Sequence, residues 1–206
     1  SSSLGSGQVL QCPYTFDKAR IIVREMTEQL VLELVEKRLV TDQIILDVGY
    51  DIESLSRREI AAQYKGEVVR DHYGRQVPKP AHGSCPLVRQ TDSLKLIMDA
   101  VLPLYDRITD SRLLVRRINI AANNVVPESM ARPAEETTQL DLFSDCETQA
   151  KRADEERAQL EREKRRQRAV VLIKGKYGKN AILKGTNFMD GATMRDRNRQ
   201  IGGHLA

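Results

Sequence analysis

Cysteine is scarce in this 206-residue chain, and its few cysteines form no recognisable pattern. The three are Cys12, Cys85 and Cys146, an odd number at wide spacing without a Cys-x-x-Cys pair. This arrangement predicts neither a disulfide framework nor a zinc site, and it fits a reducing, cytoplasmic setting. A charged-then-apolar leader and apolar runs of about 18 residues are also lacking, so we expect neither export nor membrane insertion.

Histidines and glycine-rich phosphate loops are equally sparse. The only histidines are His72, His82 and His204, and none has an acidic residue or a cysteine beside it at the spacing of metal ligands. Gly5-Ser6-Gly7 lacks the third glycine of a dinucleotide fingerprint, and Gly175-Lys-Tyr-Gly-Lys179 has the wrong spacing for a Walker loop. We therefore expect no metal and no cofactor in this chain.

Charge is abundant and unevenly distributed. Residues 1–138 carry 18 Lys and Arg against 19 Asp and Glu, whereas residues 139–206 carry 15 against 10, so the net charge of +4 comes from the second part. Residues 162–184 contain nine Lys and Arg and a single Glu. Such a stretch attracts phosphate backbones, although most charge runs are only solvated surfaces. With 40% hydrophobic and 30% charged residues, only part of the chain is expected to form a core.

Hydrophobic periodicity in the first fifty residues predicts a strand, a helix and a second strand. The apolar run at residues 8–12 reads as a strand, and Thr15 is a suitable N-cap, with Asp17 in the first turn, for a helix to about residue 39. Residues 43–50 alternate and predict a strand buried on one side. The helix places Ala19, Ile22, Val23, Met26, Leu30 and Leu34 on its apolar side, and Arg24, Glu25, Glu28, Glu33 and Glu36 on the other.

A polar, irregular insertion is expected at residues 52–80, where residues 66–74 could form a hairpin. A third strand follows at residues 81–89. The second helix is expected to begin at Thr91 or Asp92, and Pro103 should kink it or split off its last turn. A fourth strand is predicted at residues 111–123.

The resulting order, β-α-β-β-α-β, predicts an α+β, ferredoxin-like domain at residues 1–125, with two helices on one face of an antiparallel sheet. The other face should remain open for binding. Residues 126–143, with two prolines and little apolar content before residue 139, predict a flexible linker. Residues 144–206 predict a charged helical tail, in which a long helix at 150–168 projects into solvent and residues 170–173 form an apolar end able to dock.

The linker ends in Gln139-Leu140-Asp141-Leu142-Phe143. These residues could form the first turn of the following helix, with Leu140 and Phe143 packing on the domain. The pattern also resembles the pentapeptide with which bacterial DNA polymerases and repair proteins bind the replication sliding clamp. One glutamine amide and spaced apolar anchors on a tether suit a groove at micromolar affinity.

The rest of the chain strengthens the second interpretation. A β-α-β-β-α-β unit that ends in Val115-Arg-Arg-Ile-Asn-Ile120, followed by the tethered pentapeptide, resembles the C-terminal part of a Y-family translesion DNA polymerase, including its little finger domain. The segments Lys176-Tyr-Gly-Lys-Asn-Ala-Ile-Leu-Lys184 and Arg197-Asn-Arg-Gln-Ile-Gly-Gly-His204 resemble the end of UmuC/DinB-type UV-damage repair polymerases of Gram-positive bacteria. The roles of residues 197–204 and of the insertion are not evident from sequence.

The resemblance implies that the open face of the sheet binds the backbone of primer-template or damaged DNA. By position, Arg116 and Arg117 match the basic pair of the last strand, and Gly83 and Ser84 match a DNA-contacting segment of the third strand. Strand alternation places Arg116 on the apolar side unless a bulge turns it out, so Arg117 is the stronger candidate. The resemblance also implies that Gln139, Leu140, Leu142 and Phe143 bind the clamp.

Template-directed synthesis needs clustered carboxylates that hold two metal ions. In the family these lie in the palm of the Mg-dependent polymerase, N-terminal to this chain, which begins with serine and resembles a piece of a longer protein. We therefore expect no polymerase activity without the palm, fingers and thumb domains. Two alternatives remain: a stand-alone clamp-binding adaptor or decoy, and a ferredoxin-like RNA-binding module. The RNA-binding module is less favoured, because the second and last strands lack an outward aromatic pair.

Overall fold

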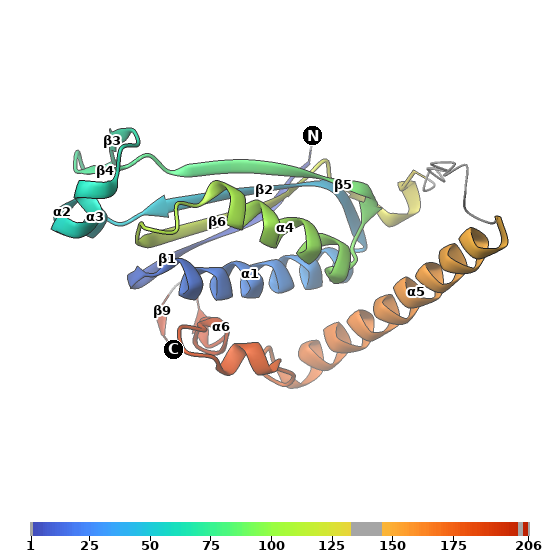
Figure 1. Cartoon of the computed structure of the whole chain (residues 1–206). Helices are drawn as coiled ribbons and strands as arrows, with labels where there is room; N and C mark the ends of the chain where they lie inside the picture. Colours follow the sequence, from blue (N-terminus) through green and yellow to red (C-terminus); the bar gives the residue numbers. More distant parts are fainter. Residues whose placement is uncertain (1, 133–145, 202–203, 206) are drawn as a thin grey trace.

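The computed structural model describes residues 2–132, 146–201 and 204–205 (Figure 1). Its centre is an antiparallel sheet with the strand order β1-β6-β2-β5, to which a short strand β7 (Val126–Pro127) adds by pairing with β2. The four long strands are β1 (Leu4–Tyr14), β2 (Leu39–Tyr50), β5 (Ala81–Thr91) and β6 (Val115–Asn123).

Two helices, α1 (Phe16–Glu36) and α4 (Leu94–Ile108), lie side by side on one face of this sheet (Figure 1). The predicted β-α-β-β-α-β order is confirmed. Each helix joins two strands between which a third strand is inserted: β6 lies between β1 and β2, and β2 lies between β5 and β6. The alternating side chains that were predicted to face the core are buried against the helices: Ile44, Leu46, Val48 and Tyr50 of β2, with Ile118 and Ile120 of β6.

Helix α4 begins at Leu94, two or three residues later than the predicted start at Thr91 or Asp92, and it continues through Pro103. The N-cap is Ser93, whose hydroxyl oxygen accepts a hydrogen bond from the backbone N–H of Leu96 at 3.2 Å. The expectation that Pro103 splits off the last turn is wrong, because α4 is one element to Ile108. Pro103 is exposed, so the carbonyl of Asp99 that loses its helical partner can be hydrated.

The insertion is more regular than its composition suggested. It contains two short helices, α2 (Glu53–Ser56) and α3 (Arg58–Gln63), and a hairpin of β3 (Val68–Arg70) and β4 (Gln76–Pro78). The hairpin lies slightly later in the chain than expected. Its turn ends at Gly74, whose φ of +77° is a conformation that glycine adopts without strain.

The long helix α5 spans Cys146–Tyr177 and extends beyond both ends of the predicted helix. Its residues 150–159 are exposed, but its second half docks on the domain, so the expectation of a helix wholly in solvent is wrong. Glu128, in the 3-10 helix η1 (Glu128–Met130), forms ion pairs with Lys164 and Arg168. Gln167 is buried and donates to the backbone carbonyl of Asp92 at 3.2 Å.

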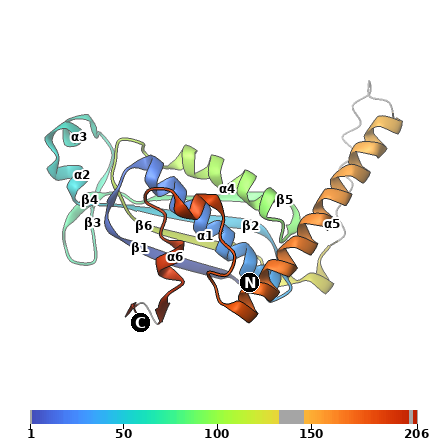
Figure 2. The ribbon, with the colours of Figure 1, turned by 90° about the horizontal axis from the view of Figure 1, so that it is seen from below.

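After α5 the chain turns back and packs on the side of α1 that faces away from the sheet (Figures 1 and 2). This tail contains the 3-10 helix η2 (Gly185–Phe188), the helix α6 (Met194–Arg197) and the strands β8 (Gln200–Ile201) and β9 (His204–Leu205). Its anchor is Glu25 of α1, which is 2% exposed although its position was predicted to be on the polar side. No helix among the described residues is long and apolar enough to cross a membrane.

Candidate nucleic-acid interface

The face of the sheet opposite α1 and α4, here called the open face, is formed by every second residue of the four long strands. Glycine, alanine or serine occupies five of the eleven positions that make up this face, so much of the surface is shallow. A shallow surface suits a broad partner better than a small ligand, which binds in a concave site. The open face consists of Gly5, Gly7 and Val9 of β1, Arg117, Asn119 and Ala121 of β6, Ile45, Asp47 and Gly49 of β2, and His82 and Ser84 of β5.

Arg117 stands exposed on the open face, between Val9 of β1 and Gly49 of β2. Gly49 leaves room for the arginine side chain: a Cβ added at Gly49 would lie 3.6 Å from Nε of Arg117. None of the ion pairs formed by the described residues involves Arg117, so its guanidinium is available to an anionic partner. An exposed guanidinium without a carboxylate partner can form strong hydrogen bonds with phosphate oxygens.

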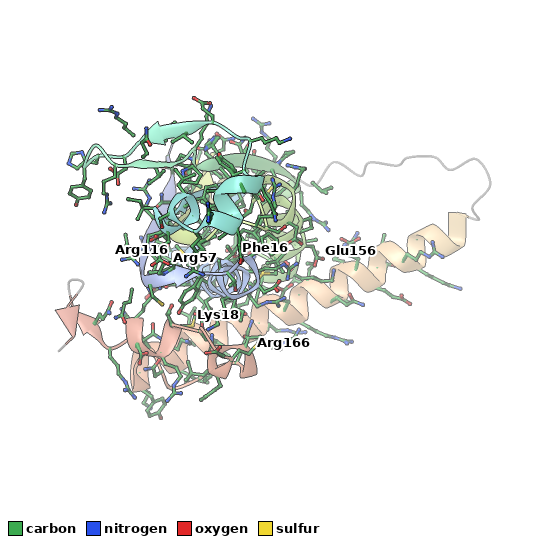
Figure 3. All side chains as sticks on the ribbon, turned by 60° about the vertical axis from the view of Figure 1, so that its left-hand side comes forward. Phe16, Lys18, Arg57, Arg116, Glu156 and Arg166 are labelled. Atoms are coloured by element: carbon green, nitrogen blue, oxygen red, sulfur yellow. The ribbon has the colours of Figure 1, made fainter. Side chains whose placement is uncertain are left out.

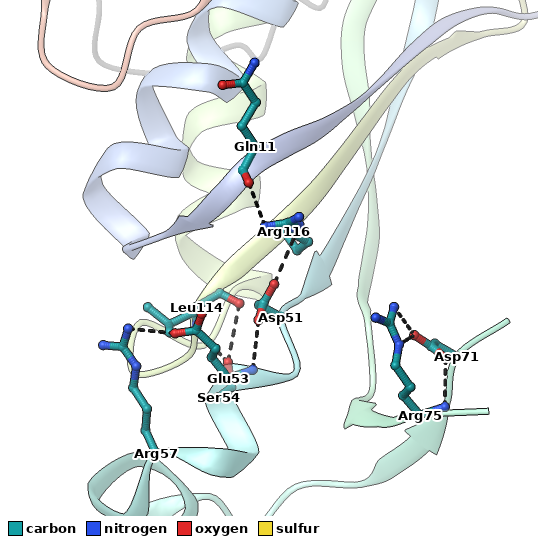
Figure 4. Close-up of polar contacts among 9 residues, drawn as sticks. All are labelled: Gln11, Asp51, Glu53, Ser54, Arg57, Asp71, Arg75, Leu114 and Arg116. Carbon is teal, nitrogen blue, oxygen red and sulfur yellow. Dashed lines mark hydrogen bonds and ion pairs between the residues drawn. The ribbon is translucent and has the colours of Figure 1, made fainter. Parts of the chain in front are cut away.

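Arg116 lies in a β-bulge. Gly49 pairs with Arg117 and Tyr50 pairs with Val115, which leaves Arg116 as an extra residue between two paired positions. Its Nη1 donates to the backbone carbonyl of Gln11 at 3.1 Å, and its Nε lies 3.7 Å from the carboxylate of Asp51 (Figure 4). The bulge thus directs Arg116 toward the end of the sheet, where protein groups already bind its guanidinium.

Gly83 and Ser84, the other two predicted DNA contacts, likewise point to different sides of the sheet. Ser84 is exposed on the open face and pairs with Ile45 of the neighbouring strand. Gly83 faces α4, and a Cβ at this position would lie 2.9 Å from side-chain atoms of both Leu104 and Ile108. Glycine therefore permits α4 to approach β5, and only its backbone could contact DNA. Because β5 is an edge strand, one side of its backbone is not used in the sheet.

Sequence analysis missed a polar pair on the open face. Nδ1 of His82 lies 2.6 Å from Oδ1 of Asp47, and both side chains are substantially exposed. Each residue was assigned to a predicted strand, but only the register of β2 with β5 shows that they face each other. Asp47 repels phosphate, which leaves Arg117 as the cationic side chain of the open face among the described residues.

The arginine-rich end of the chain binds the domain itself. Arg197 of α6 is half-buried, and its Nη1 donates to the side-chain oxygen of Gln8 at 3.0 Å. Desolvation by burial lowers the pKa of Arg197 from its ordinary value. The role of residues 197–204 was not evident from sequence, and in the structure Arg197 links α6 to β1.

The predicted clamp-binding residues Gln139, Leu140, Leu142 and Phe143 lie outside the described residues. In the part of the chain that the structure describes, no cluster of three or more His, Cys, Asp or Glu residues is placed to hold a metal ion.

Comparison with known protein families identifies the domain that contains the open face. The model of the impB/mucB/samB family C-terminal domain matches residues 1–142. That range contains the whole central sheet, the insertion and the two helices α1 and α4 that cover the sheet, and it ends before α5. A search of curated proteins finds no match.

Proposed function

The chain belongs to the impB/mucB/samB family, with the C-terminal little finger domain of a Y-family polymerase at residues 1–142, and from this premise we propose that its open face binds primer-template DNA. The observation that carries the proposal is the position of Arg117. It combines exposure on a shallow surface with the absence of a carboxylate partner among the described residues. Ser84, on the same face, adds a hydroxyl that can bind a phosphate oxygen.

The chemistry of the open face favours contacts with the DNA backbone over base recognition. Its side chains are short, apart from Arg117 and His82, and cannot reach far into a groove. Contacts with phosphates carry no sequence information. A polymerase that copies damaged templates must hold DNA of any sequence, so this type of binding suits translesion synthesis and the repair of damaged DNA.

The DNA proposal is tested by fluorescence anisotropy with a labelled primer-template over a range of salt concentrations. We expect affinity that is independent of sequence and falls steeply with salt, because bound cations displace counterions from the phosphates. Arg117→Ala should weaken binding and flatten the salt dependence by about one unit of slope. A strong preference for one sequence, or the same affinity for Arg117→Ala and wild type, would contradict the proposal.

We further propose that residues 139–143 bind the bacterial sliding clamp and thereby bring the domain to the replication fork. The support is the sequence Gln-Leu-Asp-Leu-Phe, which matches the clamp-binding pattern and directly follows the linker. Gln139 would supply the amide, Leu142 and Phe143 the apolar anchors, and Leu140 a supporting contact. Short tethered motifs of this kind bind grooves through a few apolar anchors.

Titration of the chain against a bacterial sliding clamp, beside the double variant Leu142→Ala/Phe143→Ala, tests this second proposal. Micromolar binding that the double variant loses is the expected result. Asp141→Ala is the matched control, because the middle position of the pentapeptide is variable, and it should bind like wild type. If wild type and the double variant behave alike, residues 139–143 do not bind the clamp.

A further inference from the structure

The turn of the β3–β4 hairpin is rigid and is organised by Asp71. One carboxylate oxygen of Asp71 accepts the backbone N–H groups of Tyr73 and Arg75, each at 2.9 Å. The other oxygen accepts Nε of Arg75 at 2.8 Å (Figure 4). The ion pair with Arg75 holds the pKa of Asp71 below its ordinary value, so the carboxylate stays charged at neutral pH. The turn therefore has one fixed shape.

This rigid turn presents an aromatic side chain that packs on nothing in the domain. Tyr73 is 78% exposed. The guanidinium carbon of Arg75 lies 5.0 Å from the centre of the Tyr73 ring, and the His72 ring meets it edge-on with a centroid distance of 5.4 Å. These neighbours restrict the ring but leave it open to solvent. An exposed, oriented aromatic ring costs little entropy to use in binding.

The root of the hairpin is fixed to the domain. Val77 of β4 is buried, and Lys79 forms an ion pair with Glu67 at 2.7 Å across the base of the two strands. The hydroxyl of Tyr64 donates to the carbonyl of Glu67 at 2.7 Å. Val77 thus anchors the base of the hairpin, and the contacts of Glu67 with Lys79 and Tyr64 define the position from which the turn extends.

That position is beside the open face. The insertion joins the end of β2 to the start of β5, and the hairpin reaches past the sheet on the side away from α4 (Figures 2 and 3). A duplex on the open face would thus have the hairpin at one end of its contact with the sheet.

We propose that Tyr73 stacks on an unpaired base of the template strand, next to the duplex held by the open face. The inference rests on the proposed DNA binding and adds to it a recognition of the single-stranded part of the substrate. Every base offers a π-face, so stacking on an aromatic ring tolerates any sequence. Arg75 offsets the charge of Asp71, and Arg70 on the same hairpin brings a positive charge near the strand.

The experiment compares two DNA substrates of the same sequence, a primer-template with a single-stranded template overhang and the blunt duplex. Tyr73→Ala should weaken binding to the overhang substrate by roughly 5- to 100-fold, as expected for the loss of one stacked base, and leave the blunt duplex unaffected. Tyr73→Phe keeps the ring and should bind like wild type. Because Tyr73 contacts no core residue, the thermal midpoint of unfolding should not change.

The chain supplies a matched control in Tyr177, which is 67% exposed and has Lys176 over its ring at 5.2 Å. Tyr177→Ala removes a similarly exposed tyrosine at the end of α5, and this variant should bind both substrates like wild type.

Equal weakening of both substrates by Tyr73→Ala would overturn stacking on an unpaired base. Wild-type affinity of Tyr73→Ala, together with weak binding by Arg117→Ala, would overturn the role of the hairpin and leave DNA binding by the open face intact. No DNA binding by wild type would overturn both proposals.

Discussion

Arg116 and Asp51 approach each other at the end of the sheet, with Nε of the arginine 3.7 Å from Oδ2 of the carboxylate. The Asp51 side chain is only 9% exposed, and its other oxygen accepts the backbone N–H of Glu53 at 2.8 Å, at the start of α2. Arg116 thus joins β6 to the turn that begins the insertion. Its neighbour Arg117 has no such contact and faces the open face, so two adjacent arginines have different roles.

Arg116→Ala and Arg117→Ala should therefore separate stability from DNA binding. Arg117→Ala is expected to lower DNA affinity without changing the unfolding midpoint in urea, because its side chain forms neither an ion pair nor a side-chain hydrogen bond with the other described residues. Arg116→Ala is expected to lower the unfolding midpoint, because the Asp51 carboxylate loses its cation and the Gln11 carbonyl loses its donor. DNA titrations and urea unfolding curves of both variants measure this difference.

Arg107→Ala serves as the control for both measurements, because Arg107 is exposed in the last turn of α4 on the covered side of the sheet. It should retain wild-type affinity and nearly wild-type stability. If Arg116→Ala loses as much DNA affinity as Arg117→Ala while its unfolding curve is unchanged, the structural role assigned to Arg116 is wrong.

Gly83 should tolerate no side chain, although its neighbour Ser84 should accept substitution. In Gly83→Ala the added methyl group would lie 2.9 Å from atoms of Leu104 and Ile108, so α4 or its side chains must shift. Overpacking of this type costs about 1–3 kcal/mol in the free energy of unfolding. Ser84→Ala, on the open face, should change that free energy by less than about 0.5 kcal/mol. Urea denaturation of both variants tests the assignment, and equal stability of the two would contradict it.

Much of the fold follows from periodicity. Alternation identified β2, the helical repeat identified α1 and α4, and the resulting order gave two helices on one face. The details that periodicity cannot give are those that depend on register. The bulge at Arg116 and the contact between His82 and Asp47 arise only when β2, β5 and β6 are aligned. Gly83, Ser84, Arg116 and Arg117 could thus be named from sequence as candidate DNA contacts, and alternation already favoured Arg117 over Arg116, but only the structure shows which way each one faces.

The docking of α5 was predicted only at its apolar end, residues 170–173, where Val171 packs against the core. The other contacts of α5 and those of the tail include polar groups that periodicity does not reveal. Glu163 accepts hydrogen bonds from the Ser93 hydroxyl at 2.7 Å and from the backbone N–H of Lys95 at 2.9 Å. Neither contact leaves an apolar stripe in the sequence. Glu25 looked like an ordinary solvated residue on a charged helix side, and only the tail that covers it makes it a buried residue.

The ion pairs of Glu128 should make the docking of α5 sensitive to acid. Lys164 and Arg168 hold the pKa of Glu128 below its ordinary value of 4.5. Because the pKa of Glu128 is lower in the docked form than in the undocked form, the ionised carboxylate stabilises docking at neutral pH. This stabilisation is lost as the pH falls through the lowered pKa. Glu128→Gln should accelerate amide hydrogen exchange in α5 at neutral pH and have no effect in strong acid.

Glu155→Gln is the control, because Glu155 is exposed and pairs with no cation among the described residues. A difference from wild type that persists unchanged into strong acid would contradict the mechanism.

Glu25 should hold the tail against α1 through the hydrogen bonds that its carboxylate accepts. Its Oε2 accepts the backbone N–H groups of Thr193 at 2.8 Å and Met194 at 3.0 Å, and its Oε1 accepts the Asn187 side-chain amide at 2.8 Å. Asn187 and Met194 are themselves buried. A buried donor without an acceptor costs about 1–3 kcal/mol, so the tail cannot remain docked cheaply once this carboxylate is removed.

In Glu25→Ala we therefore expect the tail to detach while the sheet and α4 remain folded. Hydrogen exchange should become fast at the amides of Thr193 and Met194 and stay slow in β2 and β6, because no core contact is lost. Glu33→Ala is the matched control on the same helix, since Glu33 pairs with Lys37 at 2.6 Å and has no hydrogen bond or ion pair with the described part of the tail. Protected amides at Thr193 and Met194 in Glu25→Ala would show that other contacts, such as that of Arg197 with Gln8, hold the tail instead.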